Sequence, residues 1–131
     1  MTPETGTIEF VRKSVAEDNI CISDLVAVAE ENIKDHDPII NSFISLCETR
    51  SLQAAENLAN IDISAISRIP LYGVLVSVKD VIDVAGVPTT AGTSVLAKNI
   101  PERDSEIVTR LTEAGAIIVG KNMMWKFDLT E

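Results

Sequence analysis

The chain has 131 residues and an ordinary globular composition, 46% hydrophobic and 24% charged, which excludes a disordered chain. Its formal net charge is −9, from 11 basic and 20 acidic residues, so direct binding to nucleic-acid phosphates is not expected. No apolar run reaches the roughly 20 residues that cross a bilayer, and the N-terminus lacks the pattern of a signal peptide. A cytoplasmic protein without membrane association is expected.

A first helix is predicted by apolar residues at helical spacing, which are Ile8, Val11, Val15 and Ala16. Ser23 is expected to cap a second helix. Pro38 should end that helix, because a proline moves the residue before it out of helical geometry. Cys21 and Cys47 have no CxxC spacing and are interpreted as small buried hydrophobic residues. His36, the single histidine, is expected at a solvated helix end.

Residues 43–46 are too short a stretch to classify alone. A third helix is predicted after them by apolar residues on one side, which are Leu52, Ala55 and Ala59. Residues 1–68 are therefore interpreted as a helical N-terminal arm, and residues 69–131 as the start of an α/β core.

The predicted core begins with a strand and a loop. Val74–Val78 is apolar at nearly every position, which suits a β-strand covered on both faces. The following loop contains Thr89–Ser94, a stretch that offers hydroxyl groups, although such a stretch is more often simply a turn.

A helix and a second strand are predicted to follow this loop. Asp104 or Ser105 can cap the helix, and Gly115 stands where a left-handed glycine ends one. Residues 116–119 are a second buried strand. The helix buries a stripe of apolar residues, which are Ile107, Val108, Leu111 and Ala114. Strand, helix and strand make one βαβ unit with parallel strands.

Residues 115–122 nearly spell the phosphate-binding pattern GxxxxGK[ST], with Asn122 at the hydroxyl position. A phosphate loop needs backbone amides that turn toward the ligand after a strand. Here the four intervening residues are themselves the predicted strand, so their amides belong to the sheet. Nucleotide binding is rejected on that context.

Lys79 is the candidate catalytic residue. It stands at the carboxyl end of the first predicted strand, the edge at which parallel sheets bind ligands. Leu75, Ser77 and Lys79 share one face, so the ammonium is expected near apolar groups, where burial favours a neutral amine that acts as a general base. The alternative is a solvated lysine that pairs with Asp80 or Asp83. These carboxylates could also orient the lysine, but without a histidine they make a poor transition-metal site.

Several motifs follow one another over residues 70–127. PLYGVLVSVKD, residues 70–80, resembles the opening of the amidase signature, in which a proline-led glycine turn precedes a strand ending in Lys-Asp. DVAGVPTTAGT, residues 83–93, resembles its next segment almost letter for letter. Further similar stretches continue in register at residues 101–108, 111–116 and 120–121, and INSFI, residues 40–44, resembles the N-terminal arm. The chain resembles the N-terminal part of an amidase-signature hydrolase.

The resemblance implies a large mixed sheet with helices on both sides, of which this α/β chain would be an incomplete part. It implies amide hydrolysis, or transfer of the released ammonia, by a Ser–cis-Ser–Lys triad without metal or organic cofactor. Lys79 matches the lysine that takes a proton through the bridging serine and so activates the nucleophilic serine. Backbone amides of a glycine- and serine-rich loop would stabilise the oxyanion.

The end of the chain departs from the family pattern. Asn122, Met123 and Lys126 stand where the family usually has threonine, asparagine and glutamate, and the serine-bearing loop is not among these residues. The chain is therefore expected to be inactive alone, and to act on a small amide only if a partner chain supplies that segment. Self-association through uncovered apolar faces is also expected.

Two alternatives remain open from the sequence. One is the amidase-like subunit of the amidotransferase that acts on glutamyl- or aspartyl-tRNA, which the stretch 41–44 favours and Val81, where that subunit usually has asparagine, disfavours. The other is a non-catalytic remnant or interaction module.

Overall fold

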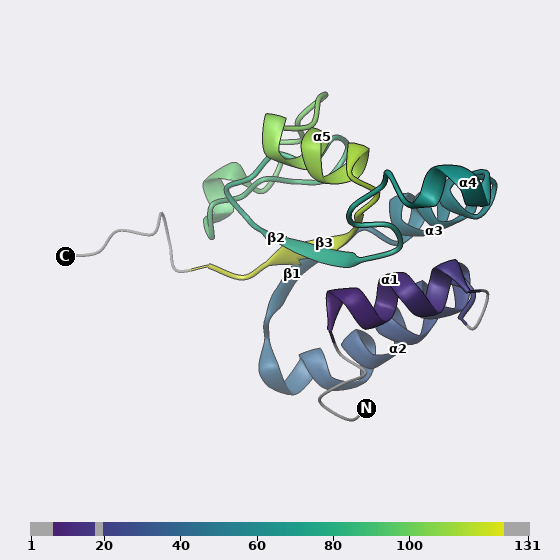
Figure 1. The fold of residues 1–131 in the computed structure, drawn as a ribbon. Coiled ribbons are helices and arrows are strands. Elements are labelled where there is room, and N and C mark those ends of the chain that lie inside the picture. The colour runs from purple at the N-terminus through teal and green to yellow at the C-terminus, as the bar shows by residue number, and fades with distance from the viewer. Residues whose placement is uncertain (1–6, 18–19, 125–131) are drawn as a thin grey trace.

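A computed structural model describes residues 7–17 and 20–124 (Figure 1). The helices are α1 Ile8–Ala16, α2 Ile22–Ile40, α3 Glu48–Ala59, α4 Ile63–Ile66 and α5 Glu106–Glu113, with a short 3-10 helix η2 at Ser94–Leu96. The strands are β1 Phe43–Leu46, β2 Leu75–Lys79 and β3 Ile117–Asn122.

The three strands form one mixed sheet in the order β1-β3-β2. β2 and β3 are parallel, which confirms the predicted βαβ unit, and α5 lies between them in the chain. β1 pairs antiparallel with β3. The stretch 43–46, too short to classify from the sequence, is therefore a strand of the same sheet. The division into an arm of residues 1–68 and a core from residue 69 stays a prediction, and both parts contribute strands to this sheet.

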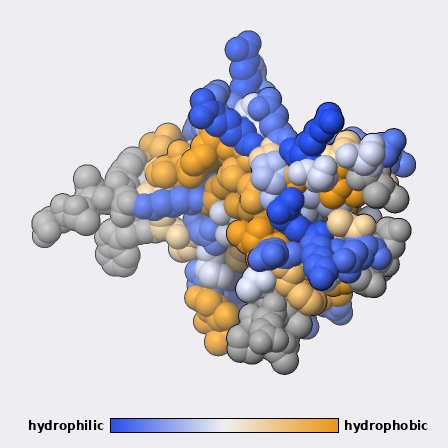
Figure 2. All heavy atoms as spheres, viewed as in Figure 1, coloured by the Kyte–Doolittle hydropathy of each residue, from blue (hydrophilic) through white to orange (hydrophobic). Residues whose placement is uncertain are grey.

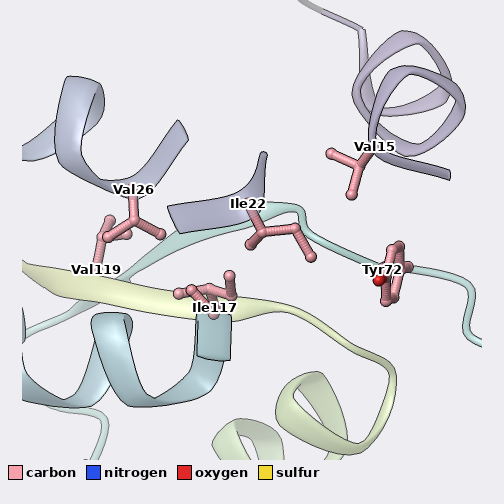
Figure 3. Close-up of a cluster of buried hydrophobic side chains, with 7 residues drawn as sticks. Val15, Ile22, Val26, Tyr72, Ile117 and Val119 are labelled. Atoms are coloured by element: carbon pink, nitrogen blue, oxygen red, sulfur yellow. The ribbon is translucent and has the colours of Figure 1, made fainter. Parts of the chain in front are cut away.

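Helices cover both sides of the sheet, with α1 and α2 on one side and α5 on the other (Figure 1). The buried cluster on the α1–α2 side joins α1, α2, α3, Tyr72 and β3 (Figure 3). Its members are Val15, Ile22, Val26, Ala55, Tyr72, Ile117 and Val119. The cluster on the α5 side consists of Cys47, Val78, Val84, Val108 and Ile118. Successive residues of β3 thus point to opposite faces, so that this strand is buried on both.

The boundaries of α2 differ from those expected. The helix begins at Ile22, with Cys21 rather than Ser23 as the capping residue, and Pro38 lies inside its last turn. Pro38 does not end the helix. The helix ends three residues later, at Asn41, because the left-handed φ of 55° there breaks the helical repeat. The Asp37 carboxylate then accepts hydrogen bonds from Ser42 N at 2.7 Å and Ser42 Oγ at 2.6 Å.

β2 is not covered on both faces, contrary to expectation. Val78 is buried, but Ser77 and Lys79 are exposed, and β2 lies at the edge of the three-stranded sheet that the described residues form. β3, at the centre, is buried from Ile117 to Lys121.

Two of the predicted helical stripes were partly wrong. In α3 the buried residues are Ser51 and Ala55, while Leu52 is 43% exposed. In α5 Val108 is fully buried but Ile107 is 52% exposed. The helix is followed by Gly115 with φ +91°, which confirms the left-handed glycine expected there.

Hydrophobic side chains also reach the surface between the helices, in the middle of the face seen in Figure 2. The exposed large apolar residues include Ile8, Val28, Ile39, Ile40 and Val95. Among the helices of the described residues, we find none long and apolar enough to cross a membrane.

Candidate catalytic site at the end of β2

Lys79 is the last residue of β2 and pairs in register with Asn122 of β3. Its side chain is exposed, on the face that it shares with Ser77. The expectation of an apolar environment around its ammonium is therefore wrong for the described part of the chain. The reason is the edge position of β2, which leaves the α1–α2 face uncovered beyond Leu75. Lys79 does lie at the carboxyl end of a parallel strand, as expected.

Asp80, the next residue, lies in a different environment. It is fully buried, and both its backbone and its carboxylate form hydrogen bonds. Its N–H donates to Asn122 O at 3.2 Å, and its carbonyl accepts from Ala91 N at 3.1 Å. The carboxylate accepts from Lys121 Nζ at 3.0 Å, and from the N–H and the hydroxyl of Thr90. Asp80 therefore pairs with Lys121.

Lys121 is the residue that reasoning from the sequence did not identify as part of the site. Its side chain is fully buried, and its ammonium donates to Pro88 O at 2.9 Å and Thr89 Oγ1 at 2.6 Å as well as to Asp80. An ammonium has three N–H donors, and these three oxygens provide an acceptor for each. The signal available in the sequence was a lysine that directly continues a fully apolar strand.

A shift in strand register explains why Lys121 faces Asp80. Val76 pairs with Ile118, but Ser77 pairs with Gly120, so that Val119 is an extra residue in β3. Lys121 therefore pairs with Val78 and points to the α5 side of the sheet, opposite to Lys79.

The loop at residues 89–94, with its hydroxyl side chains, forms hydrogen bonds to this ion pair. Thr89, Thr90 and Thr93 are all buried, and the hydroxyls of Thr89 and Thr90 face Lys121 and Asp80. The chain turns sharply after them, with left-handed φ values of 49° at Ala91 and 69° at Gly92. The loop is thus more than a turn, because two of its three buried threonines satisfy a buried charge pair.

Residues 115–122 do not form a phosphate loop. Ile117–Asn122 is strand β3, whose amides belong to the sheet. The Lys121 ammonium forms an ion pair with Asp80. The rejection of nucleotide binding from the sequence agrees with this geometry. Lys126, one of the departures from the family pattern, lies outside the described residues.

The remaining candidate residues are dispersed. Cys47 is buried, which raises the pKa of its thiol, whereas Cys21 is exposed, contrary to expectation. His36 lies exposed on α2 with Nδ1 2.8 Å from Asn32 O. Asp83 contributes its backbone carbonyl, which accepts from Ser105 N at 3.0 Å. Within residues 7–17 and 20–124, His, Cys, Asp and Glu side chains form no group of three that could hold a metal.

A groove of about 700 Å³ lies on the α5 side, between the start of α3 and the loop at residues 85–87. Its lining includes Cys47, Arg50 and Val87 but not Lys79. Lys79, at the end of β2, is therefore not part of the lining of this groove.

Comparison with known proteins assigns the family. The family model for Amidase matches residues 24–130, which include both strands of the βαβ unit and Lys79. The chain belongs to the Amidase family. Among curated relatives, a glutamyl-tRNA(Gln) amidotransferase subunit of Nitratidesulfovibrio vulgaris (strain DP4) is 37% identical over 125 residues. That match covers 94% of this chain and 25% of the relative.

Solved structures show the same fold. The peptide amidase of Stenotrophomonas maltophilia superposes with a TM-score of 0.85 at 25% identity, over 95% of this chain and 26% of that one. An amidase family protein from Bacillus anthracis str. Ames superposes with a TM-score of 0.79 at 30% identity, over 92% and 24%. This chain thus has an α/β arrangement of the amidase-signature fold and spans about a quarter of the length of the relatives it matches.

Proposed function

We propose that this chain supplies the catalytic lysine of an amide hydrolase that works through a Ser–cis-Ser–Lys triad. The observation that carries the proposal is the position of Lys79, at the carboxyl end of β2 and with an exposed side chain. The chain's membership of the Amidase family, shown over residues 24–130, supports amide hydrolysis as the reaction class.

The proposed chemistry requires a second segment of polypeptide. A serine hydroxyl is a weak nucleophile that needs an adjacent base, and a lysine acts as a base when it is desolvated. In the described part of the chain Lys79 is exposed, so we propose that the segment bringing the two serines also covers it. On this proposal the 131 residues alone are inactive, and the glycine- and serine-rich oxyanion loop comes with the same segment. A cytoplasmic location likewise stays a prediction.

A composite enzyme tests the proposal. This chain would replace the matching 26% of the Stenotrophomonas maltophilia peptide amidase. We expect ammonia release from a peptide amide by the composite and none by either part alone. A composite that unfolds in one cooperative transition and yet releases no ammonia would contradict the proposal and favour a non-catalytic module.

A subunit of the tRNA-dependent amidotransferase is the second candidate. It is favoured by the curated relatives, since the glutamyl-tRNA(Gln) amidotransferase subunits from Nitratidesulfovibrio vulgaris and Alkaliphilus metalliredigens are each 37% identical to this chain. A composite with either of these proteins would then release ammonia from glutamine only when the other subunits and the tRNA are present. Release that needs neither favours the simple hydrolase.

A further inference from the structure

The ion pair between Asp80 and Lys121 has no role in the proposed function as stated above. Both side chains are fully buried, at a separation of 3.0 Å. Burial of two charges is costly, and a pair of this kind persists only where further hydrogen bonds satisfy the remaining donors and acceptors. Thr89, Thr90 and the Pro88 carbonyl provide those bonds here.

This pair lies directly behind the candidate base. Asp80 follows Lys79 in the chain, but its carboxylate is bonded on the α5 side of the sheet, while Lys79 lies on the other side with its partner Asn122. The register shift at Val119 is what turns Lys121 to the α5 side. Without it, strand alternation would place Lys121 on the same face as Ile117 and Val119.

We propose that Lys121 is a positioning residue for Lys79. It neutralises the Asp80 carboxylate and holds that carboxylate away from the Lys79 ammonium, and it fixes the loop at residues 88–91 against the end of β2. The inference rests on the proposed function, since it affects catalysis only if Lys79 is the base.

The physical reason is the charge state that a base requires. A nearby uncompensated carboxylate favours the protonated form of an amine, and a protonated amine accepts no proton. The positive charge of Lys121 neutralises the carboxylate of Asp80, which is the carboxylate nearest to Lys79 in the sequence. Thr90 fixes the orientation of that carboxylate by two hydrogen bonds, from its N–H and its hydroxyl. The same contacts hold the backbone after Lys79, because Asp80 N–H and C=O are bonded to Asn122 and Ala91.

Acylation of the native chain gives the first test. With acetic anhydride, which attacks only the neutral amine, mass spectrometry gives a rate for each lysine. We expect Lys121 to react about tenfold or more slowly than Lys79, since it is buried and its three donors are occupied. If Lys121 and Lys79 were acylated at equal rates in the folded, unsubstituted chain, the proposal would be overturned.

Substitution of the pair gives the second test. Lys121→Met leaves Asp80 uncompensated and should slow the acylation of Lys79 about threefold. The double variant Lys121→Met/Asp80→Asn removes both charges and should restore the rate. A matched control, Lys13→Met on exposed α1, should leave the rate unchanged. A Lys79 rate that is unchanged in a folded Lys121→Met chain, or equally slow in the double variant, would show a merely structural pair.

Activity of the composite enzyme separates the two proposals. If both hold, Lys121→Met lowers kcat for amide hydrolysis with little change in KM, and the double variant recovers part of it. If Lys79→Met leaves the composite active, the proposed function fails, while the acylation rates still report on the ion pair. If Lys79→Met is inactive but Lys121→Met keeps full kcat, only the positioning role fails.

Discussion

The guanidinium of Arg50 binds both carboxylate oxygens of Asp104, at 3.0 and 2.6 Å. The two residues are 54 positions apart, one in α3 and the other just before α5. Asp104 also accepts from Ala85 N at 2.8 Å. This partly buried ion pair thus joins α3 to the crossover between β2 and β3.

Removing either member of this pair should destabilise the chain. We expect a double-mutant cycle with Arg50→Gln and Asp104→Asn, followed by urea unfolding, to give a coupling free energy of about 1–3 kcal/mol, because the contact is bidentate and both side chains are mostly buried. The matched control is Glu106–Arg110 on α5, whose side chains are 77% and 75% exposed. Its coupling should be close to zero. Equal coupling in the two pairs would contradict the account.

The same pair predicts how stability depends on pH. Burial acts to raise the pKa of Asp104, but the hydrogen bonds from Arg50 and Ala85 and the charge of Arg50 outweigh it, so the pKa is lowered. The contribution to stability is therefore complete above the unfolded pKa of about 3.9 and is lost as the pH falls through the lower folded value. Urea unfolding between pH 7 and pH 2 should show a smaller acid-induced loss for Asp104→Asn than for the native chain. Identical pH profiles would refute this.

Gly115 should tolerate no side chain. Its φ is +91°, and a Cβ there would lie 2.3 Å from Ile69 Cγ2 and 3.1 Å from the backbone of Tyr72. We expect Gly115→Ala to cost about 2–5 kcal/mol of unfolding free energy, the sum of a left-handed backbone and an overpacked contact. Gly86 is the control, with φ +75° but no atom within 4 Å, so Gly86→Ala should cost only about 1–2 kcal/mol.

Ser51 and Glu30 form a second test of buried polar contacts. Ser51 is fully buried and donates its hydroxyl to Glu30 at 2.5 Å, and Glu30 is only 7% exposed. Ser51→Ala removes this donor from a buried carboxylate, and we expect a loss of about 1–3 kcal/mol. Glu30→Gln keeps an acceptor oxygen and should cost less. The expectation is wrong if both variants melt at the native temperature.

The sequence predicted the β2–α5–β3 unit because its signals are local. An apolar run, a capping residue, a helical stripe and a terminal glycine each act within a few residues, and Gly115 confirms the last of them. The family motifs added Lys79, whose position at the end of a strand needs only the boundary of that strand. Its catalytic role stays a proposal.

The rest could not be predicted because it depends on distant partners. β1 is too short to be identified alone and exists through its pairing with β3, about 75 residues later. Lys121 is buried only because a register shift at Val119 turns it toward Asp80. The exposure of Lys79 follows from the edge position of β2, which no pattern within β2 reveals.

The most direct measurement is the turnover of the peptide-amidase composite with a substitution at Lys79. If Lys79 is the base, Lys79→Met should lower kcat on the order of 100-fold or more, while Lys13→Met, with a side chain 72% exposed on α1, should stay within about twofold of the unsubstituted composite. A Lys79→Met composite that turns over as fast as the Lys13→Met control would contradict the account.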